Sequence, residues 1–430
     1  MIYPLFQYLE SVGADFPGQG LMHYLSFRAM MAAVTAVLVA MIAGKRIIGL
    51  LQRKQIGETV RDLGLADQIQ KKGTPTMGGV IIILSILSGV LLFCDLTNIY
   101  VILLLVSTLW CGALGFADDY IKVFKHNKEG MSEKGKLLGQ IILGFVIGLT
   151  VWMSPDIVVR EKVEVKESIE RTLETETTVT TGRFKQENVV KSTKTTIPFV
   201  KNHEFDYRWL SPVKGVWGWY AKWAIYVLMI VLVITACSNG TNLTDGLDGL
   251  AAGTSAIVGV VLGIIAWLGG NLIDSNFLNI MYIPGSGEMA IFMSAFVGSL
   301  IGFLWFNSFP AQVFMGDTGS LTIGGVIGVA AVLMRKELLI PLLCGVFFAE
   351  SLSVLIQRTY FKITKKKYGQ GHRVWSMTPL HHHYQDKKAP EGPVLFPKPV
   401  PAQHEAKITV RFWIVGIILA VSTLALLKIR

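Results

Sequence analysis

Charged residues are scarce in this chain of 430 residues: only 16% are Asp, Glu, Lys or Arg, whereas 52% are hydrophobic. A soluble globular chain has about 25% charged and about 45–50% apolar residues. The near-absence of charge from long stretches excludes a soluble protein of about two or three domains. Cysteine is also rare, and the four cysteines lie in or beside apolar stretches without metal or disulfide spacing. We interpret them as small packing residues.

Segments free of Asp, Glu, Lys and Arg recur along the whole chain. A bilayer core about 30 Å thick needs roughly 20 apolar residues in a helix. The segments therefore predict an all-α polytopic integral membrane protein with about ten transmembrane helices, built as a single domain over residues 1–430. In chain order the ten segments are Ala29–Gly44, Met77–Cys94, Leu96–Ala117, Leu137–Pro155, Trp223–Thr244, Gly249–Ile273, Met289–Gly316, Thr318–Met334, Leu338–Ala349 and Phe412–Leu427.

The distribution of Lys and Arg predicts the orientation of these segments, numbered 1 to 10. The 1–2, 3–4 and 9–10 links hold seven, five and eleven basic residues, whereas the 2–3 and 6–7 links hold none and the 8–9 link holds Arg335 and Lys336. The 4–5 link holds eleven between Arg160 and Lys214, but loops of about 60 residues cross a membrane largely regardless of charge. We expect cytoplasmic odd-to-even links and extracytoplasmic termini. The net charge of +10 is thus interpreted as orientation, and no nucleic-acid partner is predicted.

Two stretches are predicted to be insertions. Residues 156–206 alternate Val and Thr with Glu and Lys around Gly182, a pattern typical of a solvated β-hairpin in the outward 4–5 loop. Residues 386–406 are rich in proline and have little periodicity, which indicates an irregular cytoplasmic loop. Neither insertion carries a catalytic constellation.

Acidic residues stand at the predicted cytoplasmic membrane edge. Asp118 and Asp119 follow the third segment, and adjacent carboxylates raise each other's proton affinity, which suits a general base or a divalent cation. Asp317 is the only charge between Glu288 and Arg335, and a lone carboxylate there indicates a metal or catalytic role. The alternatives are an ordinary polar helix end for the pair and a helix cap for Asp317.

The 5–6 link packs Asn, Thr, Asp and Gly into residues 239–249. Its glycines permit close backbone approach to a ligand, and its Asn and Asp side chains can fix a polar ring or coordinate a cation. Capping of the sixth helix by Asp245 or Asp248 is the alternative. Because a cap needs only one such group, we favour a binding function for this link.

Three further polar signals lie in or beside the predicted cytoplasmic links. Three consecutive histidines, residues 381–383, cannot easily all ligate one metal in a regular element, so we interpret them as donors to phosphate or sugar oxygens or as a surface run without a role. The pair Lys71–Lys72 precedes a Gly/Pro/Thr turn and is compatible with phosphate contact. Glu350 interrupts the ninth segment, where an ionisable group is expected to be functional or paired.

These signals converge on one face. Carboxylates, lysines and histidines on the cytoplasmic side fit Mg²⁺-dependent chemistry between a phosphorylated, water-soluble substrate and a lipid in the bilayer. Phosphoryl transfer mainly requires positioning and charge neutralisation, which Mg²⁺ and Lys supply.

At these residues the chain resembles the polyprenyl-phosphate N-acetylhexosamine-1-phosphate transferases. The histidine run after Thr378–Pro379 favours the phospho-N-acetylmuramoyl-pentapeptide transferase branch. The resemblance covers nearly the whole chain apart from the two insertions. It is carried by Gly73–Gly79, Asp118–Lys122, Asn242–Gly249, Trp305–Ser320, Thr378–Tyr384 and Val410–Trp413.

The resemblance implies a ten-helix homodimer in the bacterial cytoplasmic membrane, with its active site on the cytoplasmic face. It implies transfer of phospho-MurNAc-pentapeptide from UDP-MurNAc-pentapeptide to undecaprenyl phosphate, giving lipid I and UMP, which is the first membrane step of peptidoglycan synthesis. The implied cofactor is Mg²⁺, and the implied surroundings are the lipid bilayer.

The resemblance also implies roles for matched residues. Asp317 would be the Mg²⁺ ligand, and Asp118 the base that deprotonates the lipid phosphate, with Asp119 beside it. On the uridine side the matched positions are Asn242, Asp245, Gly246, Leu247, Asp248, Asn307 and Phe314. The other matched substrate-binding positions are Lys71, Thr76, Lys122, Lys134, His381 and His382. Gln385 stands where the family usually has Glu, so no role is carried over to it.

Three alternatives stay open at this point. A covalent aspartyl-phosphate route through Asp317 would use the same residues as direct attack by the lipid phosphate. A sister transferase that uses UDP-GlcNAc would share most of the motifs. A transporter would place charges deep inside the spans, yet apart from Glu350 the predicted spans are free of them.

Overall fold

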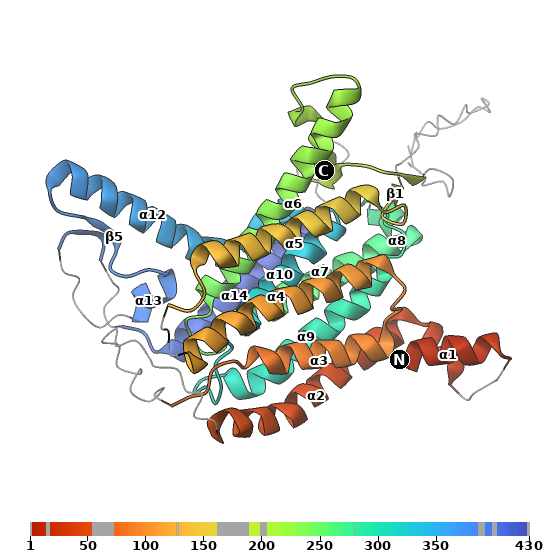
Figure 1. The fold of residues 1–430 in the computed structure, drawn as a ribbon, viewed down its shortest axis with the longest axis horizontal. Coiled ribbons are helices and arrows are strands. Elements are labelled where there is room, and N and C mark those ends of the chain that lie inside the picture. The colour runs from red at the N-terminus through yellow and green to blue at the C-terminus, as the bar shows by residue number, and fades with distance from the viewer. Residues whose placement is uncertain are drawn as a thin grey trace, which may run out of the picture.

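The computed structural model of the chain is mostly helical (Figure 1). The bundle of long, roughly aligned helices is what charge-free segments produce in a bilayer, where every backbone N–H and C=O group must be paired within the protein. The structure describes residues 2–13, 18–53, 73–125, 127, 129–160, 189–197, 204–278, 280–385, 392–397 and 402–427.

Eight of the described helices are long and apolar enough to cross a membrane. They are α2 (Leu25–Arg53), α4 (Ile99–Phe124), α5 (Glu133–Met153), α6 (Val216–Thr244), α7 (Leu250–Gly270), α9 (Gly287–Asn307), α10 (Gly316–Leu333) and α14 (Glu405–Leu426). A polytopic membrane protein is therefore confirmed.

Two shorter or broken elements complete the set. The stretch Glu337–Leu343, made of η4 (Glu337–Leu339) and α11 (Ile340–Leu343), meets α12 (Gly345–Tyr368) at 79°, and the two become a ninth crossing if they are one span. Helix α3 (Gly79–Phe93) is apolar but has only 15 residues. Each of the ten predicted segments overlaps one of these helices, while the count of about ten spans and the outward position of the termini stay predictions.

The two ends of the bundle carry different links. Figure 1 places α12, β5 (Arg373–Trp375) and α13 (Leu380–Gln385) at one end, and α1 (Ile2–Ser11), β1 (Val159–Arg160) and α8 (Leu272–Leu278) at the other. The 4–5 and 6–7 links thus lie together, opposite the 9–10 link. This arrangement agrees with the alternation predicted from the basic residues.

Helix α10 forms the centre of the bundle, and 89% of its residues are buried inside the protein. Small residues allow this, as is usual where helices cross closely in membranes. A Cβ atom on Gly79 would overlap the backbone of Gly319, and one on Gly328 would lie 2.9 Å from the Cα atom of Ile234. Helices α3 and α6 therefore approach α10 backbone to backbone.

The described part of the outward insertion forms short antiparallel pairs. Strand β1 pairs with β2 (Val189–Val190), and β3 (Lys194–Thr196) pairs with β4 (Glu204–Asp206). The predicted hairpin around Gly182 lies outside the described residues. In the proline-rich loop, β6 (Val394–Phe396) pairs in parallel with β5, while residues 386–391 and 398–401 lie outside the description.

The insertion covers the charged 8–9 link. Arg335, Lys336 and Glu337 are all buried. The backbone N–H of Thr196 and the hydroxyl of Thr195 donate to the carbonyl of Arg335 at 3.0 and 3.1 Å. The two basic residues that the sequence places in this outward link are therefore covered, and strand β3 contributes to the cover.

Substitution of Gly79 tests the close packing of α3 on α10. We expect Gly79→Ala to lower the thermal unfolding midpoint of the detergent-purified protein, because overpacking costs about 1–3 kcal/mol. The matched control is Gly263→Ala in α7, whose Cβ would meet only Met293, at an ordinary 3.5 Å. Tryptophan fluorescence during heating measures the midpoints. Equal midpoints for the two variants would contradict the close crossing of α3 and α10.

Candidate active site

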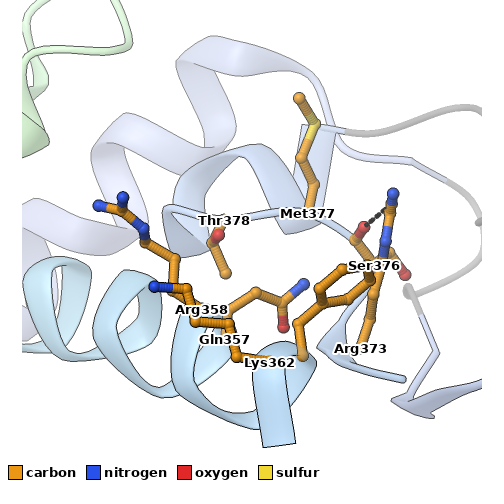
Figure 2. A pocket seen from close by; sticks show the side chains of 8 residues that line it. Gln357, Arg358, Lys362, Arg373, Ser376, Met377 and Thr378 are labelled. Atoms are coloured by element: carbon orange, nitrogen blue, oxygen red, sulfur yellow. Dashed lines mark hydrogen bonds between the residues drawn. The ribbon is translucent and has the colours of Figure 1, made fainter. Parts of the chain in front are cut away.

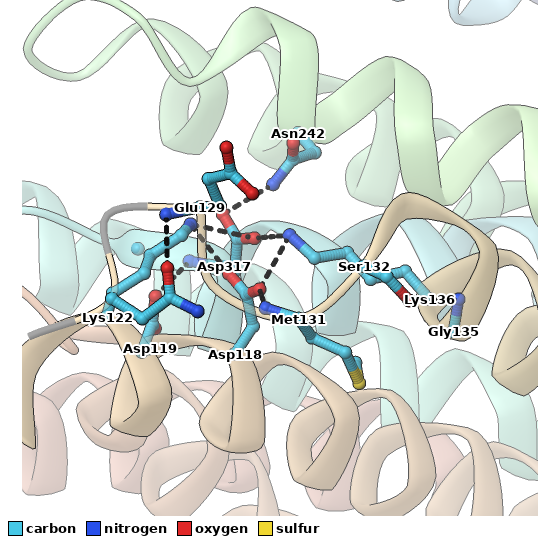
Figure 3. Close-up of polar contacts among 12 residues, drawn as sticks. Asp118, Asp119, Lys122, Glu129, Met131, Ser132, Gly135, Lys136, Asn242 and Asp317 are labelled. Carbon is cyan, nitrogen blue, oxygen red and sulfur yellow. Dashed lines mark hydrogen bonds and ion pairs between the residues drawn. The ribbon is translucent and has the colours of Figure 1, made fainter. Parts of the chain in front are cut away.

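Three carboxylates from two helices gather at one place (Figure 3). Asp118 and Asp119 lie near the end of α4, and Asp317 lies in the first turn of α10. Each offers an oxygen within 4.8 Å of the others. Asp118 and Asp119 are buried, and the side chain of Asp317 is 13% exposed. Residues almost 200 positions apart in the chain therefore form one acidic cluster.

Asp119 binds the start of α10. Its Oδ1 atom accepts from the N–H of Asp317 at 3.1 Å, and its Oδ2 atom accepts from the N–H and the hydroxyl of Thr318 at 2.9 and 2.6 Å. The first N–H groups of a helix have no partner within the helix, and a carboxylate is favourable there. Asp119 is thus a cap supplied by another helix, and it fixes the position of Asp317.

Two lysines lie between the other two carboxylates (Figure 3). The ammonium of Lys122 lies 2.6 Å from Asp118 and 3.2 Å from Asp317, and that of Lys136 lies 3.0 Å from Asp118 and also contacts Asp317. The backbone N–H of Met131 donates to Asp118 at 2.7 Å. Three carboxylates and two ammonium groups give this cluster a formal charge of −1.

Asn242 joins the cluster from α6. Its side-chain amide donates to Asp317 at 2.9 Å and to the hydroxyl of Ser320 at 2.9 Å. Asp317 therefore receives hydrogen bonds or ion pairs from three different helices. Of the residues predicted for the uridine side, Asn242 is the one that these contacts bring to the carboxylates.

The sequence prediction named Lys134, but Lys136 is the α5 residue that reaches the cluster. Lys134 is exposed in the first turn. Ser132 caps this helix by accepting from the N–H of Gly135 at 3.2 Å, and positions two residues apart point to opposite sides of a helix. In the sequence, Lys136 is one of the five basic residues of the 3–4 link that indicate orientation, and no site role is predicted for it. The cap at Ser132, which sets where the helix begins, is the signal that could have distinguished the two.

The turn before α3 lies against the loop before α10. The N–H of Phe314 donates to the carbonyl of Pro75, and the N–H of Gly78 donates to the carbonyl of Phe314, both at 2.8 Å. Gly316 has a φ of +70°, and a Cβ there would lie 3.0 Å from the hydroxyl of Thr76. Thr76 is thus buried next to the cluster, Phe314 is half-buried, and Lys71 lies outside the described residues.

The remaining residues predicted for the uridine side divide into two groups. Asp248 accepts from the N–H of Ala311 at 3.0 Å, and Asn307 accepts from the N–H of Gly249 at 3.1 Å. These two buried side chains tie the 5–6 link to the loop after α9, and Leu247 is buried in a small apolar cluster. Asp245 is half-buried and Gly246 exposed at the end of α6, so these two stay accessible to a ligand.

The histidine run forms α13, and Glu350 is its partner. The Nδ1 atom of His381 lies 3.3 Å from the carboxylate of Glu350, and both side chains are buried. A Cβ on Gly246 would overlap the imidazole of His381, so α13 lies directly on the 5–6 link. His382 is half-buried, with Nδ1 3.3 Å from the amide oxygen of Gln385.

Comparisons with known proteins identify the class. The family model described as glycosyl transferase family 4 matches residues 189–335, and the first signature of phospho-N-acetylmuramoyl-pentapeptide-transferase matches residues 71–83. The chain is thus a membrane-embedded transferase.

The curated relatives define the family within this class. Proteins called phospho-N-acetylmuramoyl-pentapeptide-transferase from Parabacteroides distasonis and Flavobacterium psychrophilum are 54% and 52% identical, and each match covers 100% of both chains. The relative from Porphyromonas gingivalis strain W83 is 52% identical over the same full coverage. The chain belongs to the phospho-N-acetylmuramoyl-pentapeptide-transferase family, which confirms the resemblance seen in its sequence.

The two α5 lysines provide a matched test of the cluster. We expect Lys136→Gln to lower the transferase kcat/KM by about 100-fold, because it removes a charged donor positioned at the reacting groups. Lys134→Gln removes the same charge from an exposed position and is expected to change kcat/KM by less than about threefold. Steady-state kinetics of the purified variants measure both, and a larger loss for Lys134→Gln would overturn the assignment.

The cap role of Asp119 predicts a stability effect. Asp119→Ala removes the partner of two helix N–H groups, and losing a cap costs about 0.5–2 kcal/mol. We expect a lower thermal unfolding midpoint, with partial recovery in Asp119→Asn, whose amide oxygen still accepts. An unchanged midpoint in Asp119→Ala would show that α10 does not depend on this carboxylate.

Proposed function

We propose that this protein transfers phospho-MurNAc-pentapeptide from UDP-MurNAc-pentapeptide to undecaprenyl phosphate, releasing UMP. The observation that carries the proposal is the cluster of Asp118, Asp317, Lys122 and Lys136, in a chain whose full-length relatives bear the name of this transferase. Acidic and basic groups side by side suit a reaction in which two phosphate groups must be brought together against their mutual repulsion.

The donor set of the cluster fits Mg²⁺. This cation usually binds through one or two carboxylates together with substrate phosphates, and Asp118 and Asp317 offer two carboxylates in a site with one net negative charge. Asp317 would hold the ion, with Asp118 beside it. When bound, Mg²⁺ neutralises charge that develops on the transferred phosphoryl group. Asp119 serves as a positioning residue, since both of its oxygens accept from α10.

The lysines and Asp118 act on the phosphates themselves. The ammonium groups of Lys122 and Lys136, which bridge the carboxylates, would donate to the diphosphate oxygens of the donor. Asp118 accepts the proton of the acceptor's phosphate. The freed phosphate oxygen attacks the β-phosphorus, and the bond from that phosphorus to the bridging oxygen breaks, so that UMP leaves with the electron pair.

The contacts of Asp317 favour this direct route over a covalent one. Its carboxylate accepts from Lys122, Lys136 and Asn242. Nucleophilic attack by Asp317 would require its carboxylate to leave the amide of Asn242, a bond that the direct route keeps intact. Detection of a phosphorylated enzyme in the absence of lipid phosphate would reverse this preference.

The site is placed on the cytoplasmic side of the bacterial cytoplasmic membrane in this proposal. Support comes from the position of the carboxylates, lysines and histidines in links that the distribution of Lys and Arg assigns to the cytoplasm. The homodimer that the resemblance implies stays a prediction.

Measurement of UMP release tests the function. Full-length protein in detergent is expected to release UMP from UDP-MurNAc-pentapeptide only with undecaprenyl phosphate and Mg²⁺ present, and to lose this activity when EDTA removes the metal. Release of UMP from UDP-GlcNAc, supplied in place of UDP-MurNAc-pentapeptide, would instead indicate the sister transferase. Flux across proteoliposomes without UMP release would indicate a transporter instead.

Asp317→Asn tests the assignment of the metal ligand. We expect it to lower kcat by about 1,000-fold, because the amide is a neutral and weaker ligand for a hard cation. The matched control is Asp274→Asn in α8, at the far end of the bundle, which is expected to retain wild-type turnover. Full Mg²⁺-dependent turnover by Asp317→Asn would refute the assignment.

A further inference from the structure

A basic cavity of about 440 Å³ lies between α12 and the segment that leads into α13 (Figure 2). Arg358 and Lys362 reach it from α12, and Arg373 reaches it from β5. Among the described residues, the rest of its lining is polar or apolar and includes Phe361 and Thr378, with no acidic residue. Its size is in the range of ligand-binding pockets, about 300–1,000 Å³.

The wall of this cavity is held in place by hydrogen bonds. The amide oxygen of Gln357 accepts from the N–H groups of Val374 and Trp375 at 2.8 and 3.1 Å, and its amide nitrogen donates to the carbonyl of Trp375 at 3.0 Å. The guanidinium of Arg373 donates to the carbonyl of Ser376 at 3.3 Å (Figure 2). Strand β5 is thereby clamped to α12, and the cavity exists before any ligand arrives.

Two of the cations that line the cavity lie on α12. Within the part of the chain that the structure describes, neither Arg358 nor Lys362 forms a salt bridge. They are four residues apart on one helix, and like charges at this spacing destabilise a helix. An anionic ligand would remove this repulsion.

The cavity is within reach of the carboxylate cluster. Asn242 binds Asp317, Gly246 follows one turn later, and His381 lies on Gly246. Thr378 precedes His381 by three residues, a distance of at most about 11 Å. A pentapeptide can extend over about 17 Å, so a peptide whose sugar-phosphate is held near His381 can reach the cavity.

We propose that this basic cavity binds the carboxylate end of the donor's peptide, an inference that rests on the proposed function. Every peptide with a free C-terminus ends in a carboxylate, and Arg binds carboxylates with two parallel hydrogen bonds. The cavity therefore selects donors that carry a peptide. An acidic lipid headgroup is less suited, because the lining residue Thr378 lies only three residues before His381, which places the cavity along the path of the donor.

Calorimetric binding to the full-length protein in detergent tests this assignment. The ligands are UDP-MurNAc-pentapeptide and UDP-MurNAc, which differ only in the peptide. In the double variant Arg358→Gln/Lys362→Gln we expect binding of the pentapeptide donor to weaken at least about tenfold, with affinity for UDP-MurNAc changing less than about twofold. The control, Lys365→Gln/Lys366→Gln, removes the same charge from exposed positions of α12 outside the cavity and is expected to leave both affinities unchanged.

Three results would overturn the assignment. Equal losses for both ligands would place the nucleotide or diphosphate in the cavity, and unchanged affinities would show that the peptide binds elsewhere. Competition by phosphatidylglycerol in mixed micelles, abolished in the double variant, would identify a lipid headgroup site. Wild-type binding that distinguishes the two donors without any UMP release would refute the proposed reaction while leaving the peptide site intact.

Discussion

The contact between the end of α4 and the start of α10 is the constraint on which the site depends. A Cβ on Gly115 would overlap the backbone of Asp317, so the two helices can meet only at a glycine. One turn further along α4, Asp119 caps α10. Because of this contact, Asp118 lies beside Asp317. The buried carboxylate of Asp118, which would be costly alone, is paired there with Lys122 and Lys136.

The other site residues are arranged around this contact by separate elements. Lys136 comes from α5, Asn242 from α6 and His381 from α13. Asn242 also bonds Ser320 and His381 pairs with Glu350, whereas Lys136 is held by the carboxylates of the cluster themselves. A site assembled in this way is positioned before substrate binds, which is the condition for electrostatic stabilisation of a transition state.

Much of this arrangement could be predicted from the sequence, because charge-free segments define the helices and the carboxylates at their ends define the active face. That Lys136 reaches the carboxylates while Lys134 is exposed depends on where α5 begins. The capping role of Asp119 depends on a contact between residues far apart in the chain, and so does the pairing of Glu350 with His381. Local pattern carries no information about such pairs.

The outward insertion has a consequence for engineering. Arg160 and Val189 are paired directly across strands β1 and β2, while β3 contacts the carbonyl of Arg335. In the described part of the insertion, contacts with the bundle include the N–H of Arg160, which donates to the carbonyl of Tyr282, and strand β3. A two-residue turn of the kind that joins antiparallel strands could connect Arg160 to Val189, giving a shorter protein with the same transmembrane core.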